Sequence, residues 1–254
     1  MTPTPGRWLR GPAGVAAAVA LSEILAATGA IPRDFLPPAS AVLARAARLP
    51  AEPGFLGDLA TTVTAWAAGL ALAVLIGVTL GLLLGGVPAV GAALRPVLEF
   101  LRPIPSVALI PLVSLILGAG LTTEVTLIVY AAVWPVLFNT IYGLSEVDPV
   151  PRDTLRVFGF GRAEVMWRVS LPAAAPFIAT GVRLAAAVGL ILAVGTEILA
   201  GFGDGLGVFI AQAQQAVAGT LDVLAGTVWA GTLGLLVNAV LVVFSRRAFG
   251  WHGR

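Results

Sequence analysis

The sequence predicts an all-α polytopic membrane protein with about six transmembrane helices and a cytoplasmic helix–glycine–helix coupling loop. Three observations lead to this fold class. Of the 254 residues, 58% are hydrophobic and only 11% are charged, whereas a soluble domain carries roughly 25% charged residues. Apolar segments recur along the chain, and most of them approach or exceed the roughly 20 residues that a bilayer crossing needs. A single arginine-rich stretch, residues 152–172, separates two of the long apolar segments.

We expect the whole chain, residues 1–254, to form one transmembrane domain. The first apolar segment contains Glu23 and is too long for the apolar region of a cleaved signal peptide, so we interpret it as a span. The third is short and contains Pro111, so we expect it to lie among other helices, where a broken hydrogen-bond ladder is tolerated. The predicted spans cover residues 13–31, 59–85, 105–119, 125–144, 173–200 and 224–244.

Small residues recur on one face of two predicted spans. Such stripes let helix backbones approach closely in lipid, so we favour helix packing over a role in moving a substrate. Between the fifth and sixth spans, residues 201–222 are too polar to face lipid, and we expect a short helix folded over an outer cavity. The small residues of the second span are Gly69, Ala73, Gly77, Gly81 and Gly85, and those of the fifth are Gly181, Ala185 and Gly189.

The arginine-rich stretch predicts an elbow between the fourth and fifth spans. Gly159 can adopt a left-handed conformation and end a short helix. Residues 162–169 then suit a second short helix, and Pro172 suits the first turn of the next long one. An elbow of this kind serves no purpose in lipid, so we expect residues 149–172 to dock a partner in the aqueous phase.

The distribution of arginine predicts the orientation of the chain. All fifteen basic residues are arginines, and eleven of them fall on the side that contains both termini and the elbow. Three lie in the long loop on the other side, and Arg183 lies inside the fifth span. The positive-inside rule therefore places both termini and the elbow in the cytoplasm.

Several classes of function are excluded by missing residue types. A P-loop requires a lysine, and the chain has none, so any ATP must be used by another subunit. Cysteine is absent and the single histidine, His252, lies in the C-terminal tail, which argues against a thiolate or histidine metal site and against a catalytic triad. The net charge of +2 is too small to indicate a nucleic-acid partner. We therefore expect no catalytic residue, no metal site and no bound cofactor in this chain.

Ionisable residues inside apolar spans are costly and are candidate functional groups. Glu23, Arg183 and Glu197 are the three such residues. The favoured interpretation is that each meets a backbone or polar group of a neighbouring helix, and the alternative is that they line a transport pathway. Gln212 could face an outer vestibule, although an ordinary polar surface is an equal alternative.

With this topology, the elbow resembles the cytoplasmic loop of the inner-membrane permease subunits of bacterial ABC importers. That loop carries Glu-Ala-Ala, three residues, a glycine, about nine residues and an Ile/Val-x-Leu-Pro end. Here residues 153–155 (Asp-Thr-Leu) take the first place, Gly159 the glycine and residues 169–172 (Val-Ser-Leu-Pro) the end. The nearest branch is the nitrate, sulfonate and taurine permeases, which the chain resembles in FLPPASAVL (35–43), FLRPIPSVALIPLVSLILGAG (100–120), LFNTIYGLSEVDP (137–149) and LPAAAPFIATGVRLA (171–185).

This resemblance implies a set of partners and a location in the bacterial cytoplasmic (inner) membrane, surrounded by lipid. Cytoplasmic ATPase subunits, which use ATP and Mg²⁺, would dock on the elbow, and an extracytoplasmic solute-binding protein would deliver a small anion or organosulfonate. A second permease copy would complete the pathway. The residues expected to contact the ATPase subunit are Asp153, Thr154, Leu155, Phe158, Gly159, Phe160, Gly161 and Arg162.

The elbow also departs from the family pattern. Asp153 shortens the acidic side chain, and Thr154 and Leu155 replace two small alanines, which leaves open how tightly the ATPase subunit is held. A homodimer is favoured and a heterodimer stays possible. The main alternative function is an ion-gradient-driven secondary transporter that uses Glu23, Arg183 and Glu197, while the missing cysteine and the lone tail histidine argue against a membrane-embedded enzyme.

Overall fold

The computed structural model describes residues 10–28, 32, 35–201, 203–217 and 219–248, and this part of the chain contains helices and loops but no strand. The predicted all-α class is confirmed. The helices are α1 (Arg10–Thr28), α2 (Ala39–Arg48), α3 (Phe55–Gly86), α4 (Pro88–Leu101), α5 (Ile110–Leu117), α6 (Leu121–Ser145), α7 (Pro149–Val157), α8 (Arg162–Val165), α9 (Leu171–Ala200), α10 (Leu206–Gln215) and α11 (Thr220–Ala248).

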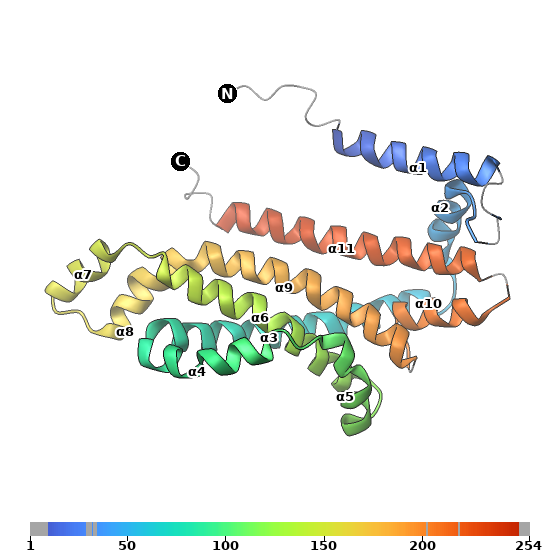
Figure 1. Ribbon diagram of the computed structural model, residues 1–254. Coiled ribbons are helices and arrows are strands. Elements are labelled where there is room, and N and C mark those ends of the chain that lie inside the picture. Colours follow the sequence, from blue (N-terminus) through green and yellow to red (C-terminus); the bar gives the residue numbers. More distant parts are fainter. Residues whose placement is uncertain (1–9, 29–31, 33–34, 202, 218, 249–254) are drawn as a thin grey trace.

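Four long helices, α3, α6, α9 and α11, run side by side and form the body of the molecule (Figure 1). Helix α6 lies between α3 and α9 and packs along both. Helices α7 and α8 form one end of the bundle, which we call the elbow end, and α2 and α10 lie at the other, which we call the far end (Figure 1). The predicted short helix between the fifth and sixth spans is present as α10.

Glycines on α3 and α9 allow the close packing of α6. A Cβ atom added at Gly77 would lie 2.8 Å from Cβ of Val136 on α6. On the other side of α6, a Cβ atom at Gly181 would lie 2.8 Å from Cβ of Asn139. Real Cβ atoms do not approach neighbouring carbons this closely, so these helices meet at this distance only because the side chains are absent. The predicted packing role of the two stripes is confirmed.

The predicted count of six spans is not reached in the described part of the chain. Four helices are long and apolar enough to cross a membrane, namely α3, α6, α11 and a continuous helix, Arg162–Ala200, that joins α8 to α9. A fifth crossing is possible only if Pro88–Leu101 and Ser106–Leu117, which are bent by 76° relative to each other, count as one broken span. The predicted first span, residues 13–31, is described as far as Thr28, and its apolar helical part, Ala13–Thr28, is about 24 Å long. Its last three residues lie outside the described part of the chain.

The predicted third span corresponds to a helical segment that is bent away from the helix before it. Residues 105–119 were expected to make one short crossing, but the helical part, Ser106–Leu117, is only about 18 Å long. Pro103 and Pro105 stand at the bend and deprive the backbone of two N–H donors, which ends α4 before the second helix begins. The stretch before them, expected as a connection, is instead the helix α4, and it lies beside the elbow end of α3 (Figure 1).

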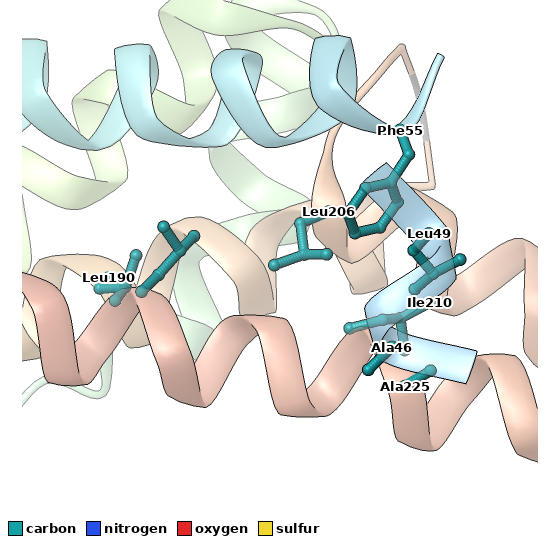
Figure 2. Close-up of a cluster of buried hydrophobic side chains, with 8 residues drawn as sticks. Ala46, Leu49, Phe55, Leu190, Leu206, Ile210 and Ala225 are labelled. Atoms are coloured by element: carbon teal, nitrogen blue, oxygen red, sulfur yellow. The ribbon is translucent and has the colours of Figure 1, made fainter. Parts of the chain in front are cut away.

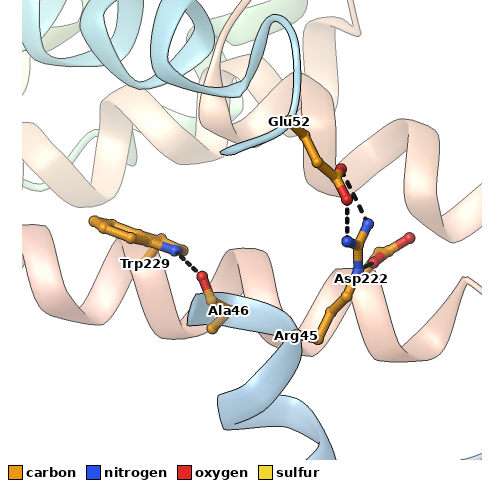
Figure 3. Close-up of polar contacts among 5 residues, drawn as sticks. All are labelled: Arg45, Ala46, Glu52, Asp222 and Trp229. Atoms are coloured by element: carbon orange, nitrogen blue, oxygen red, sulfur yellow. Dashed lines mark hydrogen bonds and ion pairs between the residues drawn. The ribbon is translucent and has the colours of Figure 1, made fainter. Parts of the chain in front are cut away.

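A cluster of buried apolar side chains holds the far end together (Figure 2). Its centre is Phe55, whose ring meets the rings of Phe209 and Trp229 edge to face at centroid distances of 5.3 and 5.8 Å. Trp229 also donates its indole N–H to the carbonyl of Ala46, at 2.9 Å, and so fixes α2 against α11 (Figure 3). The buried members of the cluster are Ala46, Leu49, Phe55, Leu190, Leu206, Ile210, Ala225 and Leu233.

Charge pairing reinforces the same end. Arg45 of α2 donates to the carboxylates of both Glu52 and Asp222, and thereby joins α2 to the loop before α3 and to the first turn of α11 (Figure 3). Hydrogen bonds to Glu52 and Asp222 raise the pKa of the Arg45 guanidinium, so it stays charged at every physiological pH. The far end is therefore a well-fixed structure, built from apolar contacts inside and ion pairs at its surface.

Candidate functional site

The elbow begins with α7, and a glycine ends this helix as predicted. The side chain of Asp148 accepts a hydrogen bond from the backbone N–H of Val150, at 2.9 Å, and caps the start of α7. Gly159 has a φ angle of +84°. The N–H of Phe160 bonds to the carbonyl of Leu155, and the N–H of Gly159 to that of Arg156, each at 3.0 Å. These two bonds define a Schellman motif, which requires the left-handed conformation that glycine adopts without strain.

The second half of the elbow differs from the prediction. Residues 162–169 were expected to form a separate short helix, but α8 ends at Val165, and the π-helical turn Met166–Ser170 carries the chain directly into α9. The extra residue of a π-turn compensates for Pro172, which has no N–H to donate, so the helix continues instead of breaking. The backbone N–H of Gly161 donates to the carboxylate of Glu164, at 3.1 Å, and closes the start of α8.

Large apolar side chains lie exposed on the elbow. The exposed fractions are 86% for Val157, 76% for Phe158 and 67% for Trp167. The Arg168 guanidinium lies 5.2 Å from the centre of the Phe160 ring, in a cation–π contact. Among the eight predicted docking residues, Leu155 and Phe160 are partly buried, whereas Asp153, Thr154, Phe158, Gly159, Gly161 and Arg162 are exposed.

The structure does not bring the four pathway candidates together. Glu23 accepts hydrogen bonds from the backbone N–H of Ser40, at 3.2 Å, and from its hydroxyl, at 2.8 Å, and so links α1 to α2. Arg183 is exposed and lines a groove of about 550 Å³ between α9 and α11, whose lining is otherwise almost entirely apolar. Gln212 is exposed on α10, in the far end of the molecule. Their role in a pathway stays a prediction.

Glu197, the fourth candidate, is buried and joins three helices at the far end. Its carboxylate accepts hydrogen bonds from the Thr62 hydroxyl of α3, at 2.7 Å, and from the backbone N–H of Gly207 of α10, at 2.6 Å. The Thr62 oxygen in turn accepts from the N–H of Leu206, at 2.9 Å. Glu197 therefore makes the polar contacts with neighbouring helices that the favoured interpretation predicted.

A second buried glutamate was missed from the sequence. Glu124 of α6 is only 7% exposed, and together with Glu197 it lines a cavity of about 120 Å³. The predicted fourth span began at residue 125, so Glu124 was assigned to a loop. Asp58, which accepts a hydrogen bond from the N–H of Gly205 at 3.3 Å, was missed for the same reason at the start of α3. An acidic residue directly before an apolar segment is the sequence signal that could have found both.

Comparison with known proteins gives the family of the chain. Residues 73–250 match the model of the family described as binding-protein-dependent transport system inner membrane component. The chain is 34% identical over 224 residues to the taurine transport system permease protein TauC of Escherichia coli (strain K12), which covers 86% of this chain and 81% of that protein. It is 28% identical to the nitrate import permease protein NrtB of Leptolyngbya laminosa and to the bicarbonate transport system permease protein CmpB of Synechococcus elongatus, and each match covers 77% of this chain and 70% of the relative.

The multi-pass helical fold and these matches define a component of a membrane transport system. The chain belongs to the family of binding-protein-dependent transport system inner membrane components, the permease subunits of ABC importers.

Proposed function

We propose that two copies of this chain form the transport pathway of an importer for small anions, and that cytoplasmic ATPase subunits drive it through the elbow. The observation that carries the proposal is the exposed apolar surface of Val157, Phe158 and Trp167 at the elbow end. These side chains lie on the short helices and turns that project from the end of the long apolar helices (Figure 1). Exposed apolar groups rimmed by charged residues are typical of a protein–protein interface.

The orientation of the chain in the membrane is inferred from the arginines of the elbow. We infer that the elbow end is cytoplasmic, because Arg152, Arg156, Arg162 and Arg168 all lie on the segment between α6 and α9. Both termini would then also be cytoplasmic, and the far end would face the solute-binding protein. In this arrangement ATP and Mg²⁺ are bound by the ATPase subunit, since no P-loop lysine exists in this chain.

The substrate class comes from the relatives. The names of the three relatives given above specify taurine, nitrate and bicarbonate. All three solutes carry an anionic group, and Arg183, which lies in an otherwise apolar groove, is the residue of this chain suited to attract one. We therefore propose a small anion or organosulfonate as the cargo, delivered by the binding protein.

Docking at the elbow can be tested with Gly159→Asp. Gly159 has a positive φ, and among the described residues no atom lies within 4 Å of a Cβ atom added there, so the change strains only the turn and charges the exposed surface. The variant should insert and fold, yet retain less of the ATPase subunit on co-purification or hydrolyse ATP without transport. Gly231→Ala, in α11 and far along the chain from the elbow, is the control and should retain the subunit fully.

Two results would contradict the proposal. Normal retention of the ATPase subunit together with normal uptake by Gly159→Asp would show that the elbow does not dock the partner. Substrate uptake into proteoliposomes by the chain alone, driven by a proton or sodium gradient, would establish the secondary-transporter alternative.

A further inference from the structure

A small polar cavity lies at the far end, where α3, α5, α6 and α9 meet the loop before α10. Its volume is about 120 Å³. This is room for one ion with a few waters, since one water molecule takes up about 30 Å³ in the liquid. The polar side chains that border the cavity have oxygen as their only polar atom type. Among them are Ser114, Thr123, Glu124, Thr196, Glu197 and Asp204.

The cavity contains acidic side chains without a cationic side chain beside them. The carboxyl groups of Glu124 and Glu197 lie next to each other, and their residues are only 7% and 5% exposed. Of the described residues that line the cavity, none is an arginine, and the chain has no lysine. A buried charge is costly unless a partner of opposite sign or several hydrogen-bond donors compensate it.

The two glutamates differ in how far the protein compensates them. Glu197 receives the Thr62 hydroxyl on one oxygen and the Gly207 N–H on the other. Within the described part of the chain, no hydrogen-bond partner reaches Oε1 of Glu124, the hydroxyl of Thr196 or the hydroxyl of Ser114. Thr196 is itself only 3% exposed. Buried polar atoms almost always have a hydrogen-bond partner. Three oxygen atoms without one around a single cavity therefore point to a bound ligand that these oxygens contact.

A monovalent cation fits this donor set. Carboxylate and hydroxyl oxygens are ligands for hard cations. The described residues contain no group of three or more metal-binding side chains, which argues against a divalent ion held by the protein alone. We propose that the cavity binds one Na⁺ ion between Glu124 and the hydroxyl groups of Ser114 and Thr196. The ion compensates the charge of Glu124 and ties the start of α6 to the end of α9.

The test is the thermal unfolding of the full-length chain, purified alone in detergent at pH 8, in NaCl and in choline chloride at equal ionic strength. A ligand that binds only the folded state raises the midpoint in proportion to ln(1 + [ligand]/Kd). The midpoint should therefore rise with Na⁺ concentration and continue to rise logarithmically above Kd. Choline, a quaternary ammonium that carboxylate and hydroxyl oxygens do not coordinate as they do a small hard cation, should have no such effect.

Variants assign the effect to the cavity. Glu124→Gln should abolish the dependence on Na⁺, and Thr196→Val should shift it to concentrations at least several-fold higher. Glu164→Gln, which removes an exposed carboxylate at the elbow, is the matched control and should respond to Na⁺ as the unchanged chain does.

Two outcomes would overturn the proposal. One is an equal midpoint in NaCl and choline chloride, which would mean that a proton or water serves the pair instead. The other is a sodium response that persists in both Glu124→Gln and Thr196→Val. Because the experiment uses the isolated chain, neither outcome depends on docking of an ATPase subunit or on transport.

Discussion

The turn at Gly159 allows a quantitative test of the elbow, because the structure separates backbone strain from steric overlap. Gly159 has a φ angle of +84°, and no described atom lies within 4 Å of an added Cβ. Replacement by alanine therefore costs only the strain of a left-handed residue, roughly 1–2 kcal/mol. Since RT is about 0.59 kcal/mol, this strain increases the opening of the turn by about 5- to 30-fold.

Hydrogen exchange measures this opening directly. The amide of Phe160 bonds to the carbonyl of Leu155 only while the turn is closed, so its protection in Gly159→Ala should fall by that factor. Gly161→Ala is the matched control, because Gly161 has a φ angle of −70° and the nearest atom to an added Cβ is 3.9 Å away. Its Phe160 amide should exchange almost as in the unchanged chain. Equal protection of Phe160 in both variants would refute the assignment of a left-handed turn at Gly159.

Two further predictions concern packing and orientation. Gly81→Ala places a Cβ atom 2.5 Å from Cβ of Thr140 and should destabilise the bundle by about 1–3 kcal/mol, whereas Gly231→Ala, with open space, should be neutral or stabilising. Denaturant unfolding of both variants measures the difference, and an unchanged midpoint for Gly81→Ala would contradict the close approach of α3 and α6. In intact cells, an impermeant thiol reagent should label Glu52→Cys but not Arg162→Cys, since this cysteine-free chain offers no other thiol. The reverse pattern would invert the proposed orientation.

The long helices and the turn at Gly159 could be predicted because their signals are local. Apolar length alone locates α3, α6, α9 and α11 to within a few residues. Gly159 adopts a left-handed conformation that other residues rarely adopt, so its identity predicts the turn. The spacing of four between small residues on α3 identifies the face that meets α6. In each case the chemistry of one short segment determines the structure, whatever the rest of the chain does.

Helix α4 and the continuous helix through Pro172 could not be predicted from local sequence patterns alone. Helix α4 contains Arg95 and Glu99, so its sequence resembles a loop between two apolar spans, and only the amphipathic pattern distinguishes it. Pro172 is an ordinary mark of a helix start, but the π-turn before it lets the helix run through. A proline removes one backbone N–H donor. Whether the helix ends there depends on the conformation of the neighbouring turns.

The buried glutamates could not be paired from the sequence. Glu124 and Glu197 lie on different helices and become neighbours only because α6 and α9 pack with their far ends level. Sequence patterns identify an ionisable residue in a span as unusual, but they do not supply its partner. The same limit applies to Arg45, whose partners are Glu52 in the loop before α3 and Asp222 in the first turn of α11.

The continuous helix Arg162–Ala200 connects the two ends that matter most for the proposed function. It begins in the elbow, next to the exposed Phe158, and ends beside the polar network of Glu197. With 39 residues it is about 58 Å long. A helix transmits a displacement along its axis, whereas two helices joined by a flexible loop absorb it. If the elbow docks an ATPase subunit as proposed, a force applied there would reach the far end through one element, and the π-turn Met166–Ser170 is the point at which that element would bend. This continuity, which the predicted break before Pro172 would have removed, connects the elbow directly to the far end of the molecule.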